Sequence, residues 1–302
     1  MSRVDTILKF CKDNYKCKEV CRDTCKNHIE NECLEDFNCL ACLNRNYNFN
    51  VNPPIKRKFC KNRCYKYLLN KLCLYASEID KIMSILKKQC NRIEIASIGC
   101  GPSTELYAID NYVNMHQEMF PEGLKYIGFD LDVDWNEITT KNQEIFEPSI
   151  IDVSYQLGKD GDFFGYYSNG NYPDVIILNF MLSDMAYYGH NAIKIFLDNL
   201  CIFFNNANKN ILLIMNDIAL INYSKDYNEL KKAHDCYLYI ENTLKETDCK
   251  IYKLFFRYPD NIHNPPNDWK ELRDKTITIN SAYNEYIGSC DSIVMIVHKK
   301  LL

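Results

Sequence analysis

Residues from about 93 onward alternate between short apolar runs and longer segments with helical spacing. The first run, Ile93–Ile98, carries apolar side chains on both faces, which is typical of a buried parallel strand. It ends in Gly99-Cys100-Gly101, where the lack of a Cβ lets backbone N–H groups approach a ligand. Residues 103–120 then place apolar positions at helical intervals. This pattern predicts a strand, a glycine turn and a helix, the first unit of a nucleotide-binding fold.

The same alternation continues to the end of the chain. Further apolar runs predict strands at 124–130, 149–153, 173–180, 210–215, 250–256 and 292–297. Amphipathic segments between them, at about 183–203 and 230–244, predict helices. We therefore expect an α/β fold with a doubly wound, seven-stranded, mostly parallel sheet.

Acidic side chains follow the second and third runs and point to an adenosine ligand. Asp130 ends the second run about 30 residues after the glycines, where a carboxylate accepts hydrogen bonds from both ribose hydroxyls. Asp152 is expected at the end of the third strand, where it could bind an adenine amino group. Trp135 could stack on the adenine or pack in the core.

These features resemble a class I S-adenosylmethionine-dependent methyltransferase over roughly residues 91–302. The resemblance implies that the methionine moiety lies against Ser97, Gly99, Cys100 and Gly101, and that the last strand runs antiparallel. Ser97 stands where the family usually has an acid, and Ser103 where it has a third glycine. The glycine turn also distantly resembles that of nicotianamine synthases, so aminopropyl transfer from the same donor is an alternative. A non-catalytic protein with a decayed donor site is another.

Ligands of such sheets bind beyond the carboxyl ends of the parallel strands, which directs attention to the segments leaving those ends. Asn179 is expected to line the donor site there. Methyl transfer mainly requires alignment, and a base is optional. The candidates for a base are Asp184, Asp217 and His263. The long connection 258–290 is expected to form a lid, and its candidate substrate contacts are Trp269, Tyr283 and Tyr286.

Cysteines are concentrated before residue 91. The start of the chain shows no signal peptide, and no run reaches the roughly 18 apolar residues of a membrane span, so we expect a cytoplasmic protein. In a reducing compartment, clustered cysteines favour metal over disulfides, although an oxidising environment would allow linked helical hairpins. The spacing of one set, which partly resembles a MYND-type finger, predicts a tetrahedral zinc site: Cys39, Cys42, Cys60 and Cys64. A second set could bind another zinc or form a buried stripe: Cys17, Cys21, Cys25, His28 and Cys33.

Charge is also uneven, because the first 90 residues are basic and the remainder is acidic. Lys56, Arg57 and Lys58 begin a basic segment interleaved with aromatic residues, a composition suited to single-stranded RNA or to a solvated helix face. RNA is therefore the first expected acceptor, and a small molecule is the alternative. We expect a cysteine-rich, basic, mainly helical module at 1–74, a connecting helix at 75–90 and the donor-binding domain at 91–302.

Overall fold

The computed structural model describes residues 1–15, 61–86, 93–183, 185, 190–219, 230, 232–245, 247–257, 265, 268–272, 277–285 and 291–299. Its helices are α1 (Arg3–Asn14), α4 (Lys61–Leu86), α5 (Thr104–Met115), α6 (Asn136–Phe146), α7 (Phe163–Tyr166), α9 (His190–Asn206) and α10 (Ala233–Leu244). Short 3-10 turns are η2 (Gln117–Met119), η3 (Val133–Trp135) and η4 (Gly158–Asp160). The strands are β1 (Ile93–Ile98), β2 (Leu124–Asp130), β3 (Ile151–Leu157), β4 (Val175–Asn179), β5 (Ile211–Ile218), β6 (Cys249–Phe256), β7 (Lys270–Leu272) and β8 (Ser292–Lys299).

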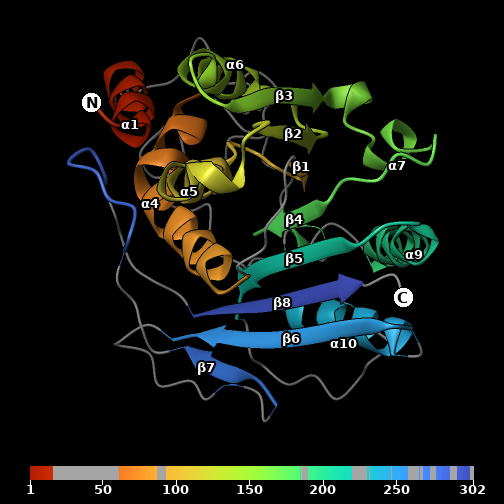
Figure 1. Ribbon diagram of the computed structural model, residues 1–302. Coiled ribbons are helices and arrows are strands. Elements are labelled where there is room, and N and C mark those ends of the chain that lie inside the picture. Colours follow the sequence, from red (N-terminus) through yellow and green to blue (C-terminus); the bar gives the residue numbers. More distant parts are fainter. Residues whose placement is uncertain are drawn as a thin grey trace, which may run out of the picture.

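The strands form one mixed sheet in the order β3-β2-β1-β4-β5-β8-β6-β7 (Figure 1). β8 runs antiparallel to both β5 and β6, and the other neighbouring pairs are parallel. The mainly parallel α/β fold and the antiparallel last strand are thus confirmed. The expected count of seven strands is wrong, because the short β7 pairs with β6 and brings the sheet to eight strands.

Helices cover both faces of the sheet, and each face has its own apolar core (Figure 1). One core joins β1 and β2 to side chains of α1, α4, α5 and α6. The other joins the opposite face of the strands to α7, α9 and α10. This burial on both faces explains why the central strands read as continuous apolar runs in the sequence.

The long helix α4 belongs to the first of these cores. Leu68, Leu72 and Ile79 are fully buried with Ile7 and Leu8 of α1 and with side chains of the sheet. The helix runs unbroken across residue 74, where we expected the first module to end. Residues 61–86 therefore pack as part of the same body as the α/β domain, while 16–60 lie outside the described residues.

Part of the connection between β7 and β8 crosses the outside of α1 and α4. The backbone N–H of Ile279 donates to Ser77 Oγ at 3.0 Å, and that of Glu285 donates to the Leu69 carbonyl at 2.8 Å. Ser281 Oγ donates to Asp5 Oδ1 at 2.6 Å. These contacts hold residues 277–285 against the two helices. Among the described helices, none has both the length and the apolar character needed to cross a bilayer.

Candidate functional site

The turn between β1 and α5 adopts a backbone conformation that ordinary residues avoid. Gly99 and Gly101 have φ angles of +62° and +48°, and Ser103, which precedes α5, has φ 59°. The N–H of Cys100 donates to the Phe129 carbonyl at 3.0 Å, which fixes the turn against the end of β2. Left-handed backbone favours glycine because a Cβ crowds the following carbonyl. The expected glycine turn is therefore present at the carboxyl end of β1.

Asp130, the last residue of β2, is hydrogen-bonded to this turn. Its Oδ2 accepts the N–H of Gly101 at 2.8 Å, and its Oδ1 accepts the N–H of Asp132 at 2.8 Å. Burial raises the pKa of this carboxyl to about 6. The residue remains partly exposed. The structure thus holds the partly exposed Asp130 carboxylate against the glycine turn at the carboxyl end of β2.

Leu131 follows Asp130 and was not singled out from the sequence. Its side chain is 78% exposed, although it is large and apolar. An exposed leucine is ordinary on a protein surface, but this one adjoins the carboxylate expected to bind a ribose. Its exposed side chain therefore lies next in sequence to the carboxylate that ends β2.

Glu105, in the first turn of α5, lies behind the glycine turn and was also missed by the sequence reasoning. Its Oε1 accepts the hydroxyls of Ser97 and Tyr126, each at 2.6 Å. The residue is only 1% exposed, and burial is the main cause of its raised pKa. Ser97 thus contacts an acid supplied by a neighbouring helix.

Asn179 at the end of β4 links this region to the next strands. Its Nδ2 donates to Thr104 Oγ1 at 3.0 Å, and its Oδ1 accepts from Asn216 Nδ2 at 3.0 Å. Asn216 Nδ2 also donates to Glu78 Oε2 at 2.8 Å, and Ser292 Oγ donates to Glu78 Oε1 at 3.0 Å. A buried polar network therefore joins α4 and α5 to the carboxyl ends of β4 and β5.

Aromatic side chains of α4 and of the strand-end loops pack together beside the network. Trp135 is buried, and its ring lies 3.5 Å from where a Cβ on Gly101 would stand. It makes an edge contact with Tyr67 at a centroid separation of 5.8 Å. Tyr75 stacks on Phe180, which follows β4 with φ 57°. Of the two roles considered for Trp135, the structure shows the packing one.

Asp217, a candidate base, is buried near the end of β5. Its Oδ2 accepts the N–H of Ser183 at 3.0 Å, and its Oδ1 accepts the N–H of Ile218 at 2.7 Å. Burial raises the pKa of Asp217 to about 6. These bonds hold the segment after β4 against β5, so Asp217 positions that segment in the described structure.

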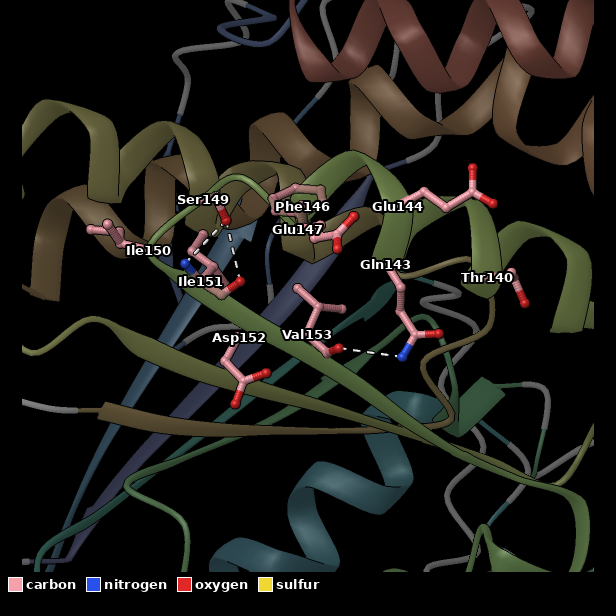
Figure 2. Close-up of a pocket in the computed structure, with 10 residues that line it drawn as sticks. All are labelled: Thr140, Gln143, Glu144, Phe146, Glu147, Ser149, Ile150, Ile151, Asp152 and Val153. Atoms are coloured by element: carbon pink, nitrogen blue, oxygen red, sulfur yellow. Dashed lines mark hydrogen bonds between the residues drawn. The ribbon is translucent and has the colours of Figure 1, made fainter.

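Asp152 does not stand where we expected it. β3 extends to Leu157, so Asp152 is the second residue of the strand and pairs with Lys125 near the amino end of β2. Figure 2 shows it beside a pocket of about 620 Å³ between α6 and the start of β3, together with Glu144 and Glu147. This pocket lies at the opposite end of the strands from the glycine turn, so the prediction of a strand-end acid at 152 is wrong.

Two of the expected substrate contacts are packed elsewhere. Trp269 precedes β7 at the far edge of the sheet, is 6% exposed and stacks on Tyr237 of α10 with an interplanar angle of 15°. Tyr283 packs against the core formed by α1 and α4. Trp269 is therefore buried against α10 and fills the core beneath that helix, where we had expected a contact with the substrate.

Several predicted residues lie outside the described residues. They are the candidate bases Asp184 and His263, the substrate contact Tyr286, the basic residues Lys56, Arg57 and Lys58, and the metal candidates Cys17, Cys21, Cys25, His28, Cys33, Cys39, Cys42 and Cys60. Cys64 is described: it is buried on α4 with its thiol 3.7 Å from the Asp134 carbonyl. Within the described part of the chain, no three His, Cys, Asp or Glu side chains are arranged to hold a metal.

No protein-family model and no curated protein matches the chain. Its fold is similar to that of solved S-adenosylmethionine-dependent methyltransferases. A proposed class I enzyme from Listeria monocytogenes has 11% identity over 99% of this chain and 88% of its own, with a TM-score of 0.48. A methyltransferase from Archaeoglobus fulgidus has 16% identity over 74% and 94%, with a TM-score of 0.41. The plantazolicin methyltransferase BamL, solved with a substrate analogue and SAH, has 10% identity over 76% and 86%, with a TM-score of 0.43. At these identities and TM-scores the likeness shows the fold alone.

Proposed function

We propose that this chain is an S-adenosylmethionine-dependent methyltransferase whose donor lies at the carboxyl ends of β1 and β2. The observation that carries the proposal is the hydrogen bond from Gly101 to Asp130, which places a ligand-accessible carboxylate beside a left-handed glycine turn. The left-handed glycine turn, an acid placed to bind a ribose and the exposed Leu131 are three complementary parts of an adenosine site.

The residues present fit such a donor in their chemistry. Asp130 would accept the ribose hydroxyls, and the turn at Gly99 and Gly101 would lie against the methionine moiety. When bound, the donor supplies a methyl group already activated on sulfur, so the protein needs mainly to align the acceptor. The buried network around Asn179 would hold the strand ends in place during that alignment.

For the acceptor we propose RNA, held by Lys56, Arg57 and Lys58. Cationic side chains neutralise phosphates, and neighbouring aromatic residues can stack on unpaired bases. The buried packing of Trp269 against Tyr237 removes one of the three aromatic contacts on which a small-molecule lid relied.

We further propose one zinc ion bound by Cys39, Cys42, Cys60 and Cys64, because four thiolates in two spaced pairs suit tetrahedral coordination. For the other set we propose a second zinc site: Cys17, Cys21, Cys25, His28 and Cys33.

The decisive experiment incubates the purified protein with methyl-labelled donor and fractionated cell extract. Label should enter RNA, and S-adenosylhomocysteine should accumulate as the co-product. Accumulation of methylthioadenosine instead would identify aminopropyl transfer, and the absence of donor binding would identify a non-catalytic protein. A Gly101→Arg variant, which fills the turn with a long side chain, is the matched inactive control.

A further inference from the structure

The buried carboxylate of Glu105 has only uncharged partners in the described part of the chain. Its Oε1 accepts two hydroxyl groups, those of Ser97 and Tyr126, at 2.6 Å each. The other groups that favour its charged form are the Asn179 amide and the backbone of Glu105 itself. No lysine, arginine or histidine of the described residues forms an ion pair with it. Burial raises the pKa of this carboxyl and so disfavours its charged form, which has no ion-pair partner among the described residues.

Removing a carboxylate from water costs several kcal/mol, and neutral hydrogen bonds recover only part of that cost. The N-terminal turn of α5 adds a modest contribution, because partial positive charge collects at a helix N-terminus. The remaining imbalance would be relieved if a positive charge bound nearby. Glu105 lies four residues after Gly101, in the first turn of α5, so a cationic ligand bound at the glycine turn would bring such a charge into this region.

A second observation also points to a missing hydrogen-bond donor in this region. Asn216 is fully buried, and its Oδ1 has no partner although its Nδ2 is bonded to Asn179 and Glu78. Buried acceptors without donors are rare in folded proteins and need a specific explanation. An ammonium group carries three donors and no acceptor, which is the complement of a network with surplus acceptors.

We infer that Glu105 is the counter-charge for the cationic part of the ligand bound at the glycine turn. The inference rests on the proposed function, under which the ligand is S-adenosylmethionine and the cation is its ammonium or its sulfonium group. Because Glu105 is almost completely buried, it would position the cation electrostatically without touching it, while Ser97 and Asn179 hold the Glu105 carboxyl in place.

The test compares the parent protein with Glu105→Gln, which removes the charge but keeps an oxygen for the Ser97 and Tyr126 hydroxyls. Binding of three ligands is measured by calorimetry: S-adenosylmethionine, S-adenosylhomocysteine and 5′-methylthioadenosine. The first carries both cations, the second only the ammonium, and the third neither. Glu105→Gln should weaken S-adenosylmethionine binding by about 10- to 100-fold, the range expected for losing a charged partner, and leave methylthioadenosine binding unchanged.

The change in S-adenosylhomocysteine affinity identifies which cation Glu105 positions. An equal loss for S-adenosylhomocysteine would assign the ammonium, and retained affinity would assign the sulfonium. Either result supports the inference. The same loss for all three ligands, or a loss for none, would overturn it, because a merely structural role does not distinguish charged from uncharged ligands.

Two controls keep the result interpretable. Glu94→Gln makes the same chemical change on the same sheet, at the amino end of β1, where Glu94 contacts Tyr167 and Lys125. It should bind all three ligands as the parent does. If Glu105→Gln does not fold, the affinities of the parent protein are compared instead. Equal affinity of the parent for S-adenosylmethionine, S-adenosylhomocysteine and deaminated S-adenosylhomocysteine would overturn the inference. A parent that binds none of these ligands would instead refute the proposed function.

Discussion

Replacing Gly99 with alanine should destabilise the protein through two effects that can be separated. The φ angle of +62° places the residue in the left-handed region, which costs an ordinary residue about 1–2 kcal/mol. In addition, the new Cβ would lie 2.4 Å from the Cγ and Sδ atoms of Met181. Moving that side chain within a packed region costs about 1–3 kcal/mol. The expected loss of unfolding free energy is therefore about 2–5 kcal/mol.

Gly170 provides a matched control for the backbone effect. Its φ angle is +77°, but a Cβ built there meets no atom within 4 Å. Gly170→Ala should therefore lose only the backbone contribution, about 1–2 kcal/mol. The difference between the two alanine variants measures the contact with Met181.

The contact can also be isolated with a double-mutant cycle between Gly99→Ala and Met181→Ala. Urea denaturation gives the unfolding free energy of the parent, both single variants and the double variant. We expect a coupling energy of about 1–3 kcal/mol, because the shortened side chain leaves room for the new Cβ. Equal losses at Gly99 and Gly170, with no coupling to Met181, would show that the segment after β4 does not press on the glycine turn.

Three further predictions concern ligands and metal. Burial raises the pKa of Asp130 to about 6, so its charged form is present above that pH and lost below it, and S-adenosylhomocysteine affinity should fall as the pH is lowered through 6. Calorimetry of the parent and of Asp130→Asn checks this prediction. An affinity of the parent that does not change with pH would exclude a role for the carboxylate. Metal analysis should find about one zinc per chain, lost in Cys42→Ser without a change in donor affinity; metal-free protein with disulfides would favour the oxidised interpretation. RNA affinity should fall by about 0.7 log units per phosphate contact for each tenfold rise in salt, and replacing Lys56, Arg57 and Lys58 with alanine should lower that slope by about two to three contacts; an unchanged slope would remove these residues from the RNA site.

The central strands could be predicted from the sequence because they are buried on both faces. β1 and β2 match their predicted bounds, and their apolar runs continue to the strand ends. β3 is an edge strand whose later residues are half-buried and include the polar Ser154 and Gln156, so the continuous apolar run ends before the strand does. Because β3 is longer than predicted, Asp152 is its second residue and not its last. β7 has three residues and no apolar pattern, so only its pairing with β6 reveals it.

The candidate site also contains some residues that the sequence predicts and others that it does not. The glycines and Asp130 follow from local pattern, since their positions depend on the chain order of β1 and β2. Glu105 could not be found in this way, because an acid in the first turn of a helix is common at exposed positions. Its burial depends on Tyr126 of β2, which is distant in sequence. The prediction that Trp269 contacts the substrate was wrong because its position in a long connection gives no sign of its tertiary contact with α10.

The unbroken course of α4 has a mechanical consequence. Its 26 residues extend about 39 Å at 1.5 Å per residue. It continues directly from the cysteine-rich segment and holds the strand ends through Glu78. Because a continuous helix is stiff along its axis, we expect a shift of its first turn to reach the acceptor atoms around Asn216. The first turn of α4 and the polar network at the strand ends thus belong to one continuous element.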